Sequence, residues 1–130
     1  METNKGYIVL SVGYEYDDEF YHTGNYGKTY DAPQKAYINK DRAHEECKKQ
    51  TFEKLRGEDL SYYGGNGLKG ICKKNMIDSF IQIMREEFDL DADDYQLKIP
   101  KTATDEQLEK VCECLSLEFF EVVEIELELE

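Results

Sequence analysis

Residues 7–16 of this 130-residue chain read YIVLSVGYEY and form its most strand-like stretch. Over the first half of the stretch, apolar residues fall on both alternating faces, a pattern typical of a strand that is covered on two sides. We therefore expect this segment to be the central strand of a sheet, with its neighbours supplied by the segments around it.

A second alternating segment closes the chain. Its apolar residues are Val123, Ile125, Leu127 and Leu129, and its glutamates are Glu124, Glu126, Glu128 and Glu130. This period of two predicts a strand with one buried and one exposed face. Shorter extended pieces are expected at 20–22, at 34–39 after Pro33, and at 95–99.

Three further segments carry the apolar spacing of amphipathic helices. The first begins with Asp41 as N-cap and ends at Gly57, the second covers about 70–88, and the third begins at a capping box formed by Thr104 and Gln107. Since the 70–88 segment has the broadest apolar face, we expect it to cover the sheet.

Strands and helices are mixed in this order without strict alternation, which favours an α+β fold over a doubly wound α/β fold. We expect a single globular domain, residues 1–130, long enough to bury a core of its own. It would contain one mostly antiparallel or mixed sheet of four to five strands, with about three helices packed on one face.

The net charge of −13 is concentrated in the second part of the chain. Residues 1–56 hold nine Lys/Arg and ten Asp/Glu, whereas residues 57–130 hold seven Lys/Arg and nineteen Asp/Glu. A strongly acidic protein repels nucleic-acid phosphates and anionic lipid, so binding to either is disfavoured. A basic protein partner fits this charge better.

The N-terminal residues are polar, and the apolar run from Tyr7 to Val12 is too short for a secretion signal or a membrane span. We therefore expect a cytoplasmic protein whose four cysteines are thiols.

No metal or cofactor is expected. The acidic turn with Asp91, Asp93 and Asp94 departs from a calcium loop that would begin at Asp89, since its sixth and twelfth positions hold Asp94 and Pro100. The cysteines lack zinc-type Cys-x-x-Cys spacing. No motif for nucleophilic or acid–base catalysis occurs, and we expect no catalytic residue.

The glycine-rich segment 58–70 predicts a flexible connector, because it lacks the spacing of a phosphate-binding loop. Should the chain bind a small ligand or be an enzyme, this segment would cover the pocket. The residues that would then take part are Tyr62, Tyr63, Gly65, Gly67 and Lys69, with His44 nearby.

Two further features each have two interpretations. Seven of the ten tyrosines precede residue 38, among them Tyr14, Tyr16 and Tyr21, and they form either a cross-strand ladder or a contact surface. Glu124, Glu126 and Glu128 either prevent strand edges from pairing or meet a row of Lys/Arg.

The function favoured by these patterns is a small acidic, non-catalytic binding or regulatory protein that engages a basic protein, as inhibitors, immunity proteins and adaptors do. Its expected contacts are the glutamate row, the three aspartates of the acidic turn, and the tyrosines. The alternative is a small-ligand-binding domain or enzyme with its pocket under the 58–70 segment.

Overall fold

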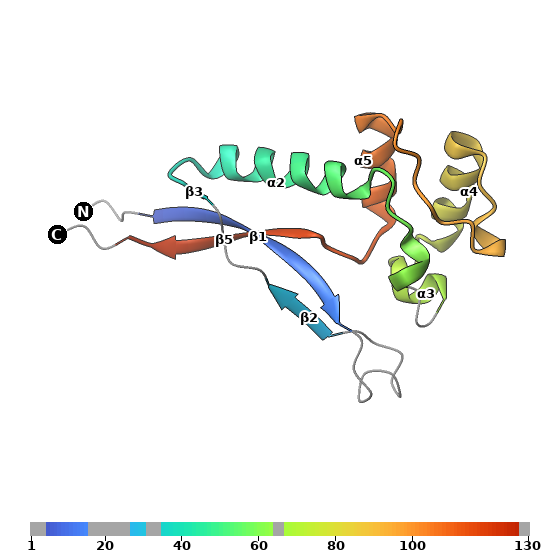
Figure 1. Ribbon diagram of the computed structural model, residues 1–130, viewed down its shortest axis with the longest axis horizontal. Coiled ribbons are helices and arrows are strands. Elements are labelled where there is room, and N and C mark those ends of the chain that lie inside the picture. The colour runs from blue at the N-terminus through green and yellow to red at the C-terminus, as the bar shows by residue number, and fades with distance from the viewer. Residues whose placement is uncertain (1–4, 16–26, 31–34, 64–66, 128–130) are drawn as a thin grey trace.

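The computed structural model describes residues 5–15, 27–30, 35–63 and 67–127. It has two parts, shown in Figure 1: an antiparallel sheet with one long helix along it, and a cluster of shorter helices at one end of that sheet. We call these the sheet end and the helical end.

Strand β1 (Lys5–Glu15) is the centre of the sheet. Strand β5 (Phe120–Glu126) pairs with residues 5–11 of β1, and the short β3 (Ala36–Tyr37) pairs with Tyr7 and Ile8. Because β3 and β5 share partners on β1, they lie on its opposite edges. Strand β2 (Gly27–Tyr30) pairs with the last residues of β1, and every pairing is antiparallel.

Helix α2 (Lys40–Leu55) lies along the sheet and contacts both β1 and β5. Its first turn is capped by Asn39, whose side-chain oxygen accepts from the Arg42 N–H at 3.1 Å. It ends before Gly57, which adopts a φ of 79° and donates its N–H to the Ile99 carbonyl. These contacts join the end of α2 to the helical end.

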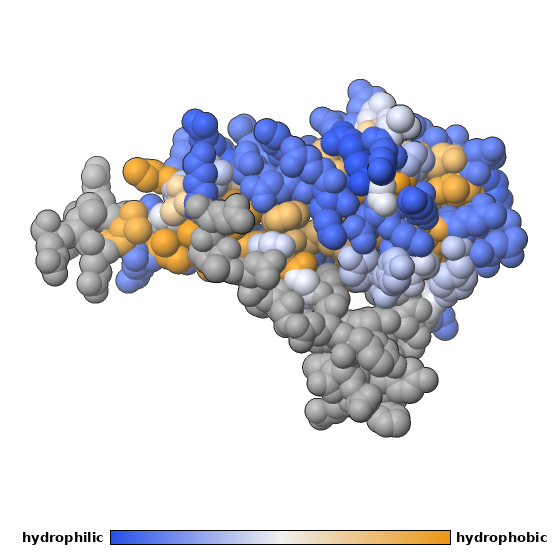
Figure 2. Space-filling model, viewed as in Figure 1, coloured by the Kyte–Doolittle hydropathy of each residue, from blue (hydrophilic) through white to orange (hydrophobic). Residues whose placement is uncertain are grey.

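The helical end contains α3 (Leu68–Ile71), α4 (Ile77–Phe88) and α5 (Asp105–Cys114), with 3₁₀ turns η1 (Leu60–Tyr63) and η2 (Ala92–Asp94). Most of the core lies here. Its fully buried members are Leu55, Leu60, Ile71, Phe80, Met84, Ala92, Leu97, Ile99, Leu108, Val111 and Cys114. Figure 2 shows that apolar side chains also reach the surface along the sheet, below the polar outer face of α2.

The expected α+β class is confirmed, but the sheet is smaller than expected. The β3–β1–β5 unit and the short β2 fall short of four to five full strands. Residues 95–99 form only an isolated bridge, between Lys98 and Asp59. The return strand expected at 20–22 lies outside the described residues.

The expectation that three helices, the 70–88 helix among them, would cover one face of the sheet was wrong. Sixteen residues of helix span about 24 Å, and seven of strand about 23 Å, so α2 alone matches the length of β5. The predicted 70–88 helix breaks into α3 and α4, and α4 packs against α5 and η2. Its broad apolar face is buried by these neighbours.

The expected starts of the first and third helices are confirmed within one or two residues, whereas the helix expected from about residue 70 is interrupted and α4 begins only at Ile77. The capping box of α5 has both of its hydrogen bonds, between Thr104 and Gln107. At α2 the N-cap is Asn39 and not Asp41, which lies in the first turn. Both are good capping residues, and the sequence alone did not distinguish them.

Candidate functional site

The two groups of acidic residues expected to bind a partner lie at opposite ends of the molecule. Glu124 and Glu126 lie on β5, at the end of the strand that pairs with Lys5 of β1, whereas η2 packs on α4 in the helical end (Figure 1). Glu128 lies outside the described residues. The structure therefore offers two separate acidic surfaces.

The η2 surface is an exposed turn whose backbone is held by its own side chains. The Asp91 carboxylate accepts from the Asp93 N–H at 3.2 Å, and the Gln96 side chain accepts from the Asp91 N–H at 3.3 Å. Arg85 lies 3.8 Å from Asp93, with 63% of each side chain exposed. Asp94 is exposed beside them, and among the described salt bridges only Asp93 of this turn is paired with a cation.

The β5 surface combines carboxylates with a strand edge. Glu124 and Glu126 are both exposed, and Lys5 forms a salt bridge to Glu124 at 3.5 Å. Lys5 also lies opposite Glu126 in the strand register. The salt bridge thus pairs Lys5 with one of the two glutamates, and about half of each paired side chain remains in solvent.

The tyrosines expected as contacts are mostly beyond what the structure describes. Tyr14 lies in β1 opposite Lys28, but Tyr16 and Tyr21 lie outside the described residues. Tyr7 and Tyr37 are direct cross-strand neighbours, and Lys35 lies over the Tyr37 ring at 5.4 Å. One rung of the expected ladder is therefore present.

The residues expected to cover a ligand pocket point in different directions. Tyr63 packs edge-on against Phe119 at 5.4 Å, and its hydroxyl donates to Glu58 at 3.2 Å, so it is part of the structural core. Tyr62, by contrast, is 76% exposed. Lys69 is exposed on α3, and Gly65 lies outside the described residues.

Gly67 lies against the hydroxyl of Tyr95. A Cβ at this position would lie 2.3 Å from the Tyr95 hydroxyl, and the φ of Gly67 is +66°. Tyr95 itself has a left-handed φ of 61°, which is rare for an aromatic residue. Only glycine fits here, and the contact joins the 58–70 segment to η2.

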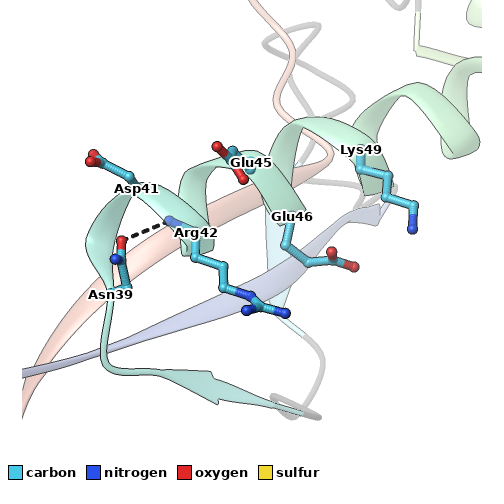
Figure 3. A pocket seen from close by; sticks show the side chains of 6 residues that line it. All are labelled: Asn39, Asp41, Arg42, Glu45, Glu46 and Lys49. Atoms are coloured by element: carbon cyan, nitrogen blue, oxygen red, sulfur yellow. Dashed lines mark hydrogen bonds between the residues drawn. The ribbon is translucent and has the colours of Figure 1, made fainter.

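Three shallow hollows lie along α2, a feature that the sequence reasoning missed. One, of about 480 Å³, is lined at the start of the helix by Asn39, Asp41, Arg42, Glu45, Glu46 and Lys49 (Figure 3). The others, of about 360 and 390 Å³, share Lys48 and Phe52 and lie where α2 passes α5. Charged residues dominate the lining of the first two hollows and make up half of the lining of the third. His44 is exposed elsewhere on the helix.

Ion pairs bridge α2 and α5 beside the two hollows that lie where these helices pass each other. Lys48 donates to Glu109 at 2.8 Å, and this hydrogen bond raises the pKa of Lys48. Arg56 pairs with Asp105 and donates through Nε to the Ala103 carbonyl at 2.9 Å. Each contact has a structural role, namely to hold the two helices together.

Of the four cysteines, Cys72 and Cys114 are buried and Cys47 and Cys112 are half-buried. Burial raises the pKa of Cys72 to about 12 and, with a contribution from Glu109, that of Cys112 to about 11. Burial also raises the pKa of Cys47 and Cys114. At neutral pH these thiols stay protonated and are poor nucleophiles. Among the described residues no group of three or more His, Cys, Asp or Glu is placed to hold a metal ion.

Comparison with known proteins found no matching family model, no matching curated protein and no matching solved structure. None of the described helices has both the length and the apolar character needed to cross a membrane. The functional argument therefore depends on the charges and geometry of this chain.

Proposed function

We propose that this chain is a small acidic, non-catalytic binding or regulatory protein that engages a basic protein partner. Its partner-facing groups are exposed carboxylates that exceed the cations beside them. The observation that carries the proposal is that, among the described residues, each acidic surface has more exposed carboxylates than salt-bridged cations: Lys5 pairs with Glu124 at 3.5 Å at β5, and Arg85 pairs with Asp93 at 3.8 Å at η2.

This charge pattern suits association. Exposed ion pairs at such distances leave most of the negative field in solvent, where it speeds encounter with an oppositely charged protein. A cytoplasmic location and an inhibitor, immunity or adaptor role belong to the same proposal.

The test is affinity capture from cells of the source organism, with the immobilised chain washed at low and at high salt. Basic proteins should be retained at low salt and released at high salt, because the Debye length falls from about 10 Å at 0.1 M to about 3 Å at 1 M. Two variants locate the binding surface: D91N/D93N/D94N at η2 and E124Q/E126Q at β5. One of them should lose the retained protein.

The matched control is E45Q/E53Q, which removes two exposed charges from α2. This variant should retain the partner, since its substitutions lie on α2 and change neither acidic surface. If the unmodified chain captures no protein at low salt, or if all three variants lose it equally, the proposal of a specific acidic contact is wrong.

A second candidate, a small-ligand site beside the 58–70 segment, has the support of one observation. Gly67 and Tyr95 meet with positive φ angles on both residues, and such backbone outliers gather at functional sites. The exposed Tyr62 ring stands on the neighbouring turn. A compound screen by thermal shift tests it: a true ligand raises the melting temperature of the unmodified chain and not that of Tyr62→Ala.

A further inference from the structure

Within the part of the chain that the structure describes, the outer edge of β5 presents backbone groups that have no partner strand. The Phe119 carbonyl accepts from the Val12 N–H at 2.8 Å, in the same register as the rest of the β1–β5 ladder. In an antiparallel ladder, the N–H and C=O groups of one residue point to one side and those of the next residue to the other. The backbone groups of Val122, Glu124 and Glu126 therefore point away from β1.

Nothing in the described part of the chain occupies this edge. There β5 pairs with β1 alone, β3 is bonded to the opposite edge of β1, and β2 is bonded to the last residues of β1. Helix α2 contacts β5 without forming a ladder with it. An edge of this kind is a template on which another extended chain can pair.

The side chains of the edge determine which chain fits. Glu124 and Glu126 are exposed on one face, two residues and so about 7 Å apart, and Val123 and Ile125 are half-buried on the other. Cross-strand neighbours of opposite charge stabilise a sheet, and like charges opposite each other destabilise it. A strand with Lys or Arg on alternate positions and apolar residues between them matches both faces.

We propose that the β5 edge binds an extended segment of a partner protein in which Lys or Arg alternates with apolar residues, and that the segment adds to the sheet as a new strand. This inference rests on the proposed function, and it specifies the surface and the chemistry of the partner. It excludes the η2 surface as the main contact.

A second copy of this chain is the less suitable occupant. Two β5 strands laid edge to edge would place glutamates of one copy against those of the other, and this repulsion opposes pairing. The glutamates thus act against self-association and in favour of a basic strand.

The probe is a fluorescein-labelled peptide of sequence KVKVKVK, with acetylated and amidated ends, titrated with the whole chain at low salt. Fluorescence anisotropy measures its affinity. Two matched peptides separate the contribution of backbone hydrogen bonds to binding from that of charge. One carries N-methyl groups on alternate residues and cannot pair as a strand, and the other has Glu in place of Lys. We expect the first peptide to bind and both matched peptides to fail.

Val122→Pro tests the edge on the protein. Proline removes the outward N–H of Val122, and this group makes no bond to β1, so the ladder to β1 keeps its hydrogen bonds. We expect KVKVKVK binding to be lost with an unchanged circular dichroism spectrum. E124K/E126K replaces attraction by repulsion and should weaken KVKVKVK binding about tenfold or more. This variant tests the same edge in case Val122→Pro unfolds the chain.

The outcomes separate this inference from the function on which it rests. Binding that survives Val122→Pro and N-methylation but is lost in D91N/D93N/D94N would overturn the β5 site and leave a basic partner at η2. Failure of every basic peptide, together with failure of affinity capture, would overturn both. A dimer in light scattering that Val122→Pro dissolves would show that the occupant is a second copy, contrary to the proposal.

Discussion

The two ends of this molecule are held together in different ways. At the helical end, side chains from α2, α4, α5 and the turns between them close around Phe80, Met84 and Leu108, all of them fully buried. At the sheet end, one helix lies over β1 and β5, and residues such as Ile8 and Val123 are only half-buried. Most of the core thus lies at the helical end, although Val9, Val12 and Ala43 are buried at the sheet end, and the open strand edge lies at the sheet end.

This difference suggests a division of roles. Buried apolar area supplies most of the free energy of folding, so the helical end holds the structure together. The sheet end can then expose an unpaired edge with Glu124 and Glu126 without weakening the core. Binding surfaces are commonly found on such thinly packed parts of a stable scaffold.

The largest expected effect compares the same substitution at the two ends. Ile99→Ala removes a fully buried side chain from the helical end and should lower the free energy of unfolding by about 2–5 kcal/mol. Ile8→Ala removes a half-buried side chain from β1 and should cost less than half as much. Urea denaturation followed by circular dichroism measures both. Equal losses would show that the sheet end contributes to the core as much as the helical end does.

The sequence predicted local elements better than their packing. The central strand, the glutamate-bearing last strand and the α5 capping box were all found, because each depends on residues close together in the chain. Gly57 and Thr104 ended and began helices where expected, for the same reason.

Packing between distant segments was less predictable. The apolar face of 70–88 fits a sheet as well as it fits other helices, and its spacing does not show that α5 and η2 bury it. The Gly67–Tyr95 contact joins residues that are far apart in the sequence, each with an unusual φ. The two acidic groups could be listed from the sequence, but their placement at opposite ends depends on the pairing of β5 with β1 and on the packing of η2 against α4.

A smaller effect is expected from the thiols of the helical end. Burial raises the pKa of Cys72 to about 12 from an unfolded value of 9.0. Its contribution to stability is therefore complete below pH 9 and is lost as the pH rises towards 12, with a slope of at most about 1.4 kcal/mol per pH unit. Urea denaturation at several pH values above 8 should show a shallower decline for Cys72→Ala.

Other groups titrate in the same range, so the informative quantity is the difference in slope between the two proteins. Cys72→Ala also removes a small buried volume, which lowers stability by the same amount at every pH. Parallel pH profiles would mean that the Cys72 thiol is accessible to solvent. The helical end would then be less tightly packed than the burial of Cys72 indicates.

The smallest expected effect is on stability at the sheet end. Lys5→Gln breaks the 3.5 Å salt bridge to Glu124, in which 43% and 50% of the two side chains are exposed. Such a pair should change the free energy of unfolding by less than about 1 kcal/mol. The affinity for KVKVKVK should rise, since Glu124 becomes free to meet a lysine of the peptide. Lys98→Gln makes the same charge change at the helical end, on an exposed residue. If it raised the affinity as much as Lys5→Gln does, net charge and not the β5 edge would govern binding.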